Sequence, residues 1–379
     1  YKMEIVKNKK VLISGASISG LTTAWFLKKL GYEVTIVELS AKPRTGGTSL
    51  NLSGNALEFA KQMGIYEQIL SNSLSLDLIE FKDTNDETVN SIVINGGGED
   101  QNKTEEHNFD EIEIDRSKLV GIILDALGND VTFMFSNSIT TLNETENNMK
   151  VTFNDGSQGT YDLVIGADGM HSGVRKIWFG TEKEYTHFLK AYGSITTVNR
   201  ELIKPNTMQW YNVPGKAYML SANKDKTDIV FFFISDKEIT YDFRNIEQQK
   251  KIIYDQFVDG WRTTELIVEV KNSDNFYFVN LSQIKMPSWT KGRVALVGDA
   301  AYCASPAAGM GGSLAMEGAG TLAGALQKHN GNFELAFNDY NKKMRPFIDE
   351  VQARAEADIQ ENWIPRTQEA IDKRNQKGF

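Results

Sequence analysis

The chain reads Gly298-Asp-Ala-Ala-Tyr-Cys-Ala-Ser-Pro-Ala-Ala-Gly-Met-Gly-Gly-Ser-Leu-Ala-Met-Glu-Gly-Ala319 at the point that decides its fold. Apolar residues 294–297 precede this segment, so the pattern predicts a buried strand that ends on Gly-Asp, a loop through Pro306 and three glycines, and an alanine-rich helix. Backbone N–H groups at a glycine-rich helix start favour a phosphate or another electron-rich group, and the Asp299 carboxylate can accept hydrogen bonds from sugar hydroxyls. The segment therefore predicts an anion cradle with one carboxylate at its edge.

Composition and length set the class of protein. A chain of 379 residues with ordinary apolar content predicts a globular protein of two domains. The net charge of −9, with no cluster of basic residues, argues against nucleic acid as the main partner. The single cysteine, Cys303, and four scattered histidines predict no metal site. Because the chain has neither an apolar run of roughly 18 residues nor a signal-peptide pattern at residues 1–10, we expect no stable membrane insertion, a cytoplasmic location and a monomer.

A second glycine-rich turn, Gly15-Ala-Ser-Ile-Ser-Gly20, lies inside a predicted strand–helix–strand unit over residues 10–38. In a dinucleotide-binding turn the first glycine makes the tight turn, the last lets the helix pack on the strand, and the helix start receives the pyrophosphate. Ser17 stands at the middle position in place of glycine, so either its Cβ holds the phosphate farther away or its hydroxyl donates to it. Glu38 ends the second strand and is expected to bind ribose hydroxyls. The alternative is a turn that needs glycine only for packing. The predicted pyrophosphate contacts are Gly15, Ser17, Ile18, Ser19 and Gly20.

A third segment reads Tyr161-Asp-Leu-Val-Ile-Gly-Ala-Asp-Gly-Met-His-Ser-Gly-Val-Arg175. With it, the chain resembles the class A flavoprotein monooxygenases of the para-hydroxybenzoate hydroxylase type, whose Asp-Gly motif has this form. The 298–319 segment is similar to the Gly-Asp motif of that family, and 15–20 to its dinucleotide turn. The resemblance implies a cofactor role for Asp168, with helix capping as the alternative, and a flavin contact for Arg116.

Within that family the chain is most similar to tetracycline-inactivating monooxygenases. This likeness rests on Arg44-Thr-Gly-Gly-Thr-Ser-Leu-Asn-Leu-Ser-Gly54 and on Met63-Gly-Ile-Tyr-Glu-Gln-Ile69. It implies that Arg44 contacts the nicotinamide cofactor or the flavin, and it places Asn51 where an acid often lies beside the flavin. Tyr302 and Met310 replace the usual His and Gln of the Gly-Asp motif, so the substrate is not carried over from the resemblance.

The resemblance implies an FAD-dependent monooxygenase that uses NADPH or NADH and O2. A flavin C4a-hydroperoxide would transfer one oxygen atom to an aromatic or polyketide-like small molecule, tetracycline being one candidate, while the protein positions the cofactor and excludes water. The residues expected around the flavin and ribityl region are Asp299, Pro306, Gly309, Gly311, Gly312 and Ser313. Those expected at the substrate are Trp210, Phe231, Phe233, Tyr302 and Met310.

The predicted architecture is α/β (α+β), with a Rossmann-like FAD-binding domain, an interleaved antiparallel-sheet substrate domain and a long C-terminal helix. Within it we expect one helix over 55–70, a small antiparallel meander that includes 131–135 and ends at 161, a separate antiparallel sheet over 191–278, and a helix over 332–362. The FAD-binding domain is assigned to 9–76, 106–186 and 279–331, the substrate domain to 77–105 and 187–278, and the C-terminal helix and tail to 332–379.

Two other functions stay open. A flavin-dependent halogenase of the same fold usually has Trp-x-Trp-x-Ile-Pro before the Gly-Asp motif, whereas this chain has only Trp363-Ile-Pro365, near its end. A flavin-binding protein without turnover is the second alternative. Small residues over 318–324 are expected to serve helix packing, and Cys303 to be a small buried thiol. His171 is either a surface or capping residue or a catalytic one.

Overall fold

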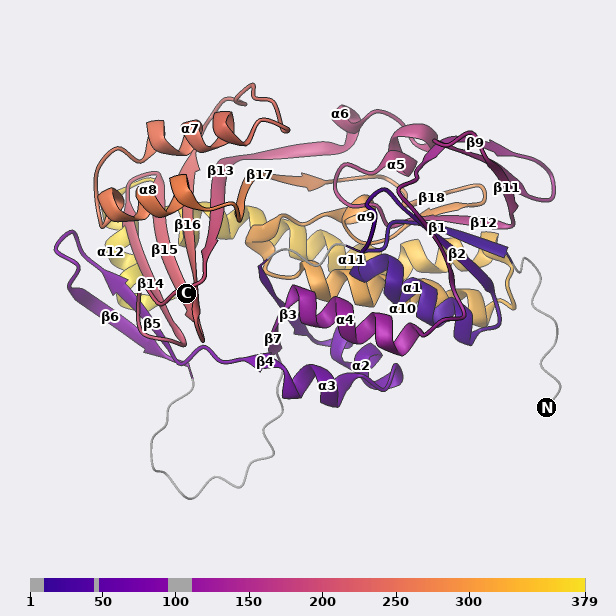
Figure 1. Ribbon diagram of the computed structural model, residues 1–379, viewed down its shortest axis with the longest axis horizontal. Coiled ribbons are helices and arrows are strands. Elements are labelled where there is room, and N and C mark those ends of the chain that lie inside the picture. Colours follow the sequence, from indigo (N-terminus) through magenta and orange to yellow (C-terminus); the bar gives the residue numbers. More distant parts are fainter. Residues whose placement is uncertain (1–9, 44–47, 95–110, 379) are drawn as a thin grey trace, which may run out of the picture. The chain divides into compact units, whose positions relative to one another are not determined.

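The computed structural model describes residues 10–43, 48–94 and 111–378 (Figure 1). Its internal contacts divide the chain into two compact units. Unit 1 consists of Tyr1–Ser73, Phe109–His187 and Gln283–Ala353, and unit 2 of Leu74–Asn108, Phe188–Ser282 and Arg354–Phe379. The chain thus passes repeatedly between the units, and its last 26 residues, 354–379, belong to unit 2 instead of standing apart as a tail.

Unit 1 is built on a six-stranded sheet with the order β18-β19-β12-β1-β2-β8. Its strands are β1 (Lys10–Ser14), β2 (Glu33–Glu38), β8 (Thr132–Phe135), β12 (Leu163–Gly166), β18 (Thr290–Lys291) and β19 (Val294–Leu296). The strands from β19 to β8 run parallel, and only β18 is antiparallel to its neighbour. The central strands are continuous apolar runs because helices and smaller sheets cover both faces, as in doubly wound folds.

Four helices pack together in unit 1. Helix α10 lies along α1 and α2, and α1 also contacts α4 (Figure 1). Glycines permit the close approach, because a Cβ at Gly320 would lie 2.3 Å from the Phe59 ring and one at Gly318 would lie 1.7 Å from the Tyr302 hydroxyl. Gly318 and Gly320 therefore serve close packing, as expected for 318–324, whereas Gly324 has open space around it. The helices of unit 1 are α1 (Ile18–Lys29), α2 (Asn55–Gln62), α3 (Tyr66–Ser71), α4 (Arg116–Leu127), α5 (Gly173–Trp178), α6 (Glu182–Tyr185), α9 (Asp299–Tyr302), η1 (Pro306–Ala308), α10 (Gly311–Lys328) and most of α11 (Phe333–Asp358).

Three expectations about these elements were wrong. The single helix expected over 55–70 is two helices, because Gly64, with φ of 71°, ends α2 in a left-handed turn before α3 starts. The strand expected in the meander at 131–135 is β8, which pairs parallel with β2 at the edge of the main sheet. The loop expected after Gly298 begins with the short helix α9. The meander itself consists of β9 (Ile139–Glu144), β10 (Met149–Phe153) and β11 (Gln158–Tyr161). A further small sheet is formed by β3 (Ser49–Ser53), β7 (Glu111–Asp115) and β4 (Ser73–Leu74).

Unit 2 is built on a seven-stranded sheet with the order β17-β13-β16-β15-β14-β5-β6. It is largely antiparallel, as expected, but β14 and β5 pair in parallel. Helices α7 and α8 lie over one face, where buried rings and aliphatic side chains of the sheet and both helices form one core (Figure 1). The elements are β5 (Leu78–Lys82), β6 (Thr88–Val93), β13 (Thr186–Val198), β14 (Thr207–Val213), β15 (Lys216–Asn223), β16 (Lys226–Ile234), α7 (Ile246–Gln256), α8 (Thr263–Asn272) and β17 (Phe276–Ile284).

The C-terminal segment ends differently from the expected long helix. Helix α11 ends at Asp358, a π-helical turn, Ile359–Trp363, follows, and a further helix, α12 (Gln368–Lys377), closes the chain. The buried Arg374 of α12 donates to Asn212 of β14 and to the carbonyl of Asn362, so α12 is fixed to the unit 2 sheet. Burial lowers the pKa of the Arg374 guanidinium to about 10.

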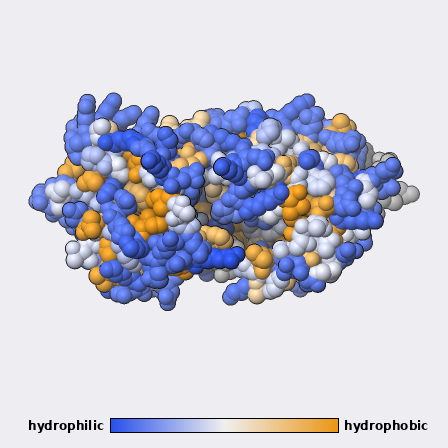
Figure 2. Space-filling view, turned by 90° about the horizontal axis from the view of Figure 1, so that it is seen from above, coloured by the Kyte–Doolittle hydropathy of each residue, from blue (hydrophilic) through white to orange (hydrophobic). Residues whose placement is uncertain are grey.

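The exposed surface is mainly polar on the face seen in Figure 2, where hydrophobic residues form small groups among hydrophilic ones. Within the described part of the chain, no helix has the length and hydropathy needed to cross a membrane.

Candidate functional site

The dinucleotide turn connects β1 to α1 in unit 1, and its two glycines are required by close backbone contacts. Gly15 has φ of 106°, and a Cβ there would lie 2.4 Å from the carbonyl oxygen of Ala167. A Cβ at Gly20 would lie 1.9 Å from the carbonyl oxygen of Gly15. Packing therefore explains both glycines, as the alternative interpretation expected, and it also brings the helix start against the end of β12. In the first turn, the backbone N–H groups of Ile18 and Ser19 have no acceptor within the described part of the chain, as a helix start that receives an anion requires.

Ser17 is the N-cap of α1. Its hydroxyl accepts a hydrogen bond from the Gly20 N–H at 3.2 Å and donates to the Ala167 carbonyl at 2.8 Å. A second short contact, 2.9 Å, joins it to the Ser19 hydroxyl. Because the proton of Ser17 is directed to Ala167, its hydroxyl caps the helix, and the alternative in which this hydroxyl donates to a phosphate has no support in this geometry.

Glu38 has a structural task in addition to the one expected. Its two carboxylate oxygens accept the backbone N–H of Ala16 at 2.8 Å and that of Ser40 at 2.9 Å, and its side chain is 8% exposed. Glu38 thus ties the end of β2 to the glycine turn. Each carboxylate oxygen can accept more than one hydrogen bond, so contact with a ribose hydroxyl is compatible with this arrangement.

Asp168 accepts hydrogen bonds at the start of the short helix α5, whose N-cap residue is Ser172. Its Oδ1 accepts from the Ser172 hydroxyl at 2.5 Å, and its Oδ2 accepts from the Val174 N–H at 3.1 Å and the Ser14 hydroxyl at 3.3 Å. The capping alternative is therefore present in the structure, and any cofactor role of Asp168 is additional to it. Desolvation raises the pKa of the Asp168 carboxyl, although the donors from α5 oppose that rise.

Arg175 is a buried crosslink that the sequence interpretation did not single out. Its guanidinium, with no exposed surface, donates to the Ala300 carbonyl at 2.8 Å and to the Met170 carbonyl. The Asp-Gly loop is thereby fixed to α9. The signal was the arginine of the quoted 161–175 segment, which pointed to family membership but not to this role.

The three motifs meet at one edge of the parallel sheet. Ala167, which follows β12, contacts the Gly15 turn that follows β1, and a Cβ at Gly298, which follows β19, would lie 2.8 Å from the Ser19 hydroxyl. All three motifs therefore lie at the carboxyl ends of adjacent parallel strands, which is where open α/β sheets bind their ligands.

Helix α10 starts on the small β3 sheet. The Ser313 hydroxyl accepts from the Ser53 N–H at 2.9 Å and donates to the Asn51 carbonyl at 3.2 Å, while a Cβ at Gly312 would lie 2.6 Å from Leu50. The Ser313 side chain thus links α10 to β3 by two hydrogen bonds. No side chain caps the first turn of α10, so the N–H groups of Gly311 and Gly312 are available to an electron-rich ligand.

Asp299 lies at the start of α9, close to a positive charge. Its carboxylate is exposed yet crowded by protein atoms, and the resulting desolvation raises its pKa, whereas the charge of Arg116 lowers it. The Cys303 thiol also hydrogen-bonds to this carboxylate, and burial together with the Asp299 charge raises the pKa of the thiol. Cys303 is thus a buried thiol, as expected, which orients Asp299.

The segment between Asp299 and α10 carries backbone strain. Ser305, 6% exposed, has φ of 79° and ψ of 149°, a region that glycine alone adopts freely, at a cost of roughly 1–3 kcal/mol. Pro306, Gly309 and Gly311 follow, and they are exposed although most of their neighbours are buried. Such strain is found where the surrounding structure fixes a functional turn.

The residues expected at the substrate lie mostly inside the cores. Tyr302, 1% exposed, packs edge-on against Trp289, its hydroxyl accepts from that of Tyr340 at 3.0 Å, and its pKa is raised by burial to about 12. Phe231 and Phe233 face the unit 2 core beside Phe257, whereas Trp210 packs edge-on against Trp363. Met310 is partly exposed, and its sulfur accepts from the Ser53 hydroxyl at 3.8 Å. Packing accounts for all of these side chains except Met310.

Two further residues bear on the site. Arg44 lies outside the described residues, so its contact stays a prediction. His171 is exposed, and its Nδ1 is within hydrogen-bond distance, 2.6 Å, of the Glu182 carboxylate, which makes it a surface residue. Among the residues that the structure describes, no three His, Cys, Asp or Glu side chains are placed to hold a metal ion.

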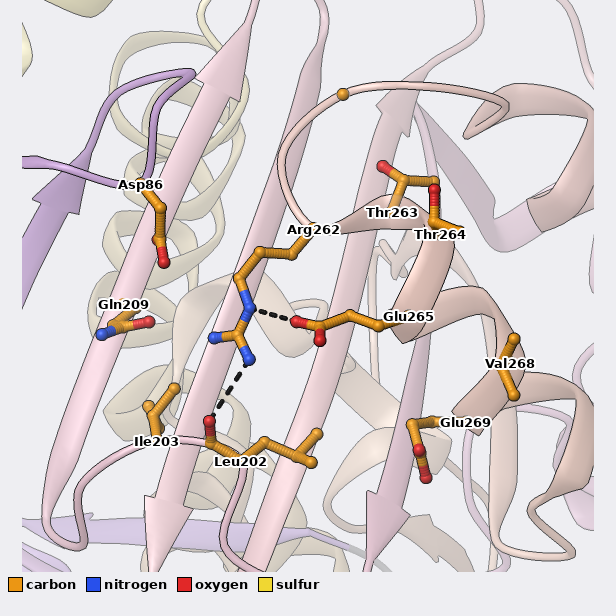
Figure 3. Close-up of a pocket in the computed structure, with 11 residues that line it drawn as sticks. Asp86, Leu202, Ile203, Gln209, Arg262, Thr263, Thr264, Glu265, Val268 and Glu269 are labelled. Carbon is orange, nitrogen blue, oxygen red and sulfur yellow. Dashed lines mark hydrogen bonds and ion pairs between the residues drawn. The ribbon is translucent and has the colours of Figure 1, made fainter.

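A hollow of unit 2 is a different site. It has a volume of about 1060 Å³ and contains none of the residues expected to bind FAD or substrate. Arg262 crosses it and bonds to Glu265 and to the Leu202 carbonyl, as Figure 3 shows. Since Asp86, Glu265 and Glu269 also line it, the hollow lacks the positive character that an anionic dinucleotide needs.

The residues of unit 1 fit a flavin dinucleotide. The Gly15–Gly20 turn leaves no room for side chains against the backbone, two helix starts offer N–H groups, and the Asp299 carboxylate is open to hydroxyl donors. These are the donors and acceptors that a pyrophosphate, a ribityl chain and an isoalloxazine edge require.

The chain matches the family model described as FAD binding domain over residues 8–355, and it belongs to this family. It is an FAD-dependent monooxygenase, as the resemblance predicted. A flavin-dependent monooxygenase of Legionella longbeachae serogroup 1 (strain NSW150) is 35% identical over 351 residues, which span 90% of this chain and 87% of the relative.

Two solved structures are similar along nearly the whole chain. The tetracycline destructase Tet(51) has a TM-score of 0.83 and 33% identity, and the match covers 98% of this chain and 95% of that one. The tetracycline destructase Tet(55) has a TM-score of 0.84 and 31% identity, with 98% and 94% covered. The predicted fold class is thereby confirmed.

Proposed function

We propose that this monooxygenase oxidises a tetracycline-like polyketide, with NADPH or NADH as the electron donor, and thereby inactivates the compound. The observation that carries the proposal is the similarity, along nearly the whole chain, to two tetracycline destructases. That similarity extends over the residues of unit 2 and is therefore not limited to the cofactor motifs.

We assign the ADP half of FAD to the β1–α1 turn. There the N–H groups of Ile18 and Ser19 would bind the pyrophosphate, and Glu38 would hold the turn and accept from the ribose. These groups act by binding and orientation alone, and they need no change of protonation during turnover.

We assign the flavin half to the segment from Asp299 to Ser313. Asp299 would accept hydrogen bonds from the ribityl hydroxyls, and Arg116 would supply a positive charge beside them. The first turn of α10 would direct N–H groups at the electron-rich edge of the isoalloxazine, and its fixed dipoles favour negative charge there. When bound and reduced, FAD supplies the activation of O2 and the transfer of one oxygen atom to the substrate.

Mass spectrometry after incubation with NADPH, O2 and tetracycline tests the proposal. We expect a tetracycline product heavier by one oxygen atom, with NADPH consumed in proportion. The control is Asp299→Ala, which should remain folded, retain little FAD and leave tetracycline intact. If tetracycline stays intact with the FAD-loaded wild type while a phenol or indole in the same panel gains oxygen, the tetracycline assignment is wrong and the monooxygenase class stands.

A further inference from the structure

Two buried glutamines of unit 1 contact the backbone between Asp299 and Pro306. Gln283 lies in β17 and has no exposed surface, and Gln352 lies in α11 and is 5% exposed. Each stands where the chain changes units, since the unit boundaries fall at 282/283 and 353/354. Neither glutamine belongs to a motif of the family resemblance.

Their amide groups engage three successive carbonyls. The Gln352 Nε2 donates to the carbonyls of Cys303 at 3.1 Å and Tyr302 at 3.4 Å, and also to that of Ile284 at 2.8 Å. The Gln283 Nε2 donates to the Ala304 carbonyl at 3.2 Å and to the carbonyl of Gln352 itself at 2.7 Å. The two side chains therefore form one connected unit, which we call the amide clamp.

The amide clamp leaves one buried polar atom without a hydrogen-bond partner in the described part of the chain. The Oε1 atom of Gln283 is buried and has no hydrogen-bond partner within the described residues. Its orientation is fixed, because the NH2 group faces two carbonyls that need donors. A buried acceptor without a partner is unfavourable, so the stabilising contribution of the Gln283 amide comes from its two donated hydrogen bonds.

The clamped carbonyls come directly before the strained residue. Ser305, with φ of 79° and ψ of 149°, follows Ala304 and precedes Pro306, and a strained residue persists only where its surroundings fix it. The backbone N–H of Ser305 also hydrogen-bonds to the Cys303 sulfur, and the Cys303 thiol contacts Asp299. The clamp thus acts at once on the turn that begins at Pro306 and on the orientation of Asp299.

We propose that Gln283 and Gln352 are positioning residues which hold Ser305 in its strained conformation and thereby fix the Pro306–Gly311 turn and Asp299 against the flavin. The inference rests on the proposed placement of the flavin at this segment. It assigns these residues no contact with FAD or substrate; they act through the backbone of 302–305.

The test uses the purified holoenzyme without substrate, so its result is independent of the tetracycline assignment. In Gln352→Met, which keeps the length of the side chain but removes its donors, we expect FAD to dissociate about tenfold faster, as the net loss of a buried hydrogen bond implies. The visible absorption spectrum of the bound flavin should shift as well. In Gln62→Met, the matched control on an exposed position of α2, neither should change.

Ser305→Gly distinguishes positioning from general loss of structure. Glycine adopts the conformation of Ser305 without strain, so we expect the double variant Gln352→Met/Ser305→Gly to recover the wild-type rate of FAD dissociation to within about twofold. Failure of this rescue would overturn the proposal. So would a folded Gln352→Met protein whose flavin spectrum and dissociation rate match the wild type.

Gln283→Met keeps the proposal testable if Gln352→Met does not fold. This variant removes the buried unpaired oxygen together with the donors, so the two effects on stability oppose each other. We expect a folded protein in which FAD dissociates several-fold faster and in which Ser305→Gly again restores the rate. Wild-type dissociation from folded Gln283→Met would contradict the role of Gln283.

Discussion

The sheet edge of unit 1 and the sheet of unit 2 differ in how well the sequence predicts the residues that form them. At the carboxyl ends of β1, β12 and β19, backbone approaches backbone, and only glycine or another small residue fits. In unit 2, large aromatic side chains fill a core between a sheet and two helices. A cofactor site formed by backbone groups therefore requires small residues at fixed spacings, which can be recognised in the sequence. A pocket lined by large side chains has no such sequence pattern.

The largest expected effect tests the backbone side of this contrast. In Gly20→Ala the new Cβ would lie 1.9 Å from a backbone oxygen, so we expect a loss of about 4 kcal/mol or more in the free energy of unfolding, together with the loss of FAD. Urea denaturation and the flavin absorbance per chain measure both. Gly324→Ala is the matched control, since it is also helical but has open space around it, and it should stabilise by about 0.5–1 kcal/mol. Normal stability and flavin content in Gly20→Ala would contradict the claim that close backbone contacts at this sheet edge exclude a side chain.

The second prediction concerns the core of unit 2. Phe231 has no exposed surface, and its ring lies 4.6 Å from that of Phe257, so Phe231→Ala should cost about 3–5 kcal/mol in the unfolding free energy. FAD per folded chain should stay unchanged. Phe243→Ala, at a 74% exposed position, should alter stability by less than about 0.5 kcal/mol. A Phe231→Ala protein with wild-type stability but altered substrate binding would indicate that Phe231 lines the substrate pocket.

A third, smaller effect is expected at Glu38. Glu38→Ala removes the acceptor of the buried Ala16 N–H and one acceptor of the half-buried Ser40 N–H, so we expect a loss of about 2 kcal/mol in stability and weaker binding of FAD. Glu38→Gln keeps one acceptor oxygen and should lose less of both. Glu33→Ala, at the exposed start of the same strand, serves as the control. FAD affinity is measured by fluorescence titration. Equal affinity in Glu38→Ala, Glu38→Gln and Glu33→Ala would show that Glu38 does not contribute to binding the adenosine half of FAD.

The smallest expected effect on stability is at Asp299. Desolvation raises the pKa of this carboxyl above its ordinary value of 3.8, so its contribution to stability is present below that value and is lost as the pH rises through the folded-state pKa. At pH 7 to 8, Asp299→Asn should therefore unfold no more readily than the wild type. FAD retention should fall by about tenfold, because a charged acceptor is lost. Clear destabilisation at pH 8 with full FAD retention would contradict both statements.

The sequence predicted the fold class, the cofactor and most elements of the parallel sheet, because the continuous apolar strands and the glycine turns are local patterns. It did not predict that Ser17, Glu38 and Asp168 also hold backbone groups, since a hydrogen-bond partner far along the chain leaves no local signal. It placed β8 in the wrong sheet because a short apolar strand looks the same in either.

The substrate side was less readable for a related reason. An aromatic residue predicts burial equally well against a core or a pocket. Phe231 and Phe233 of β16 and Tyr302 of α9 all pack in cores. Gln283 and Gln352 carried no signal at all, because a buried glutamine is recognised only once its partners are known.

The central claim is that FAD binds at the single sheet edge where the three motifs meet. A crystal structure of the FAD-loaded chain tests it most directly. We predict the pyrophosphate at the first turn of α1, within hydrogen-bond distance of the Ile18 and Ser19 N–H groups, and the isoalloxazine against the Pro306–Gly311 turn. Flavin density that contacts neither segment would contradict the account.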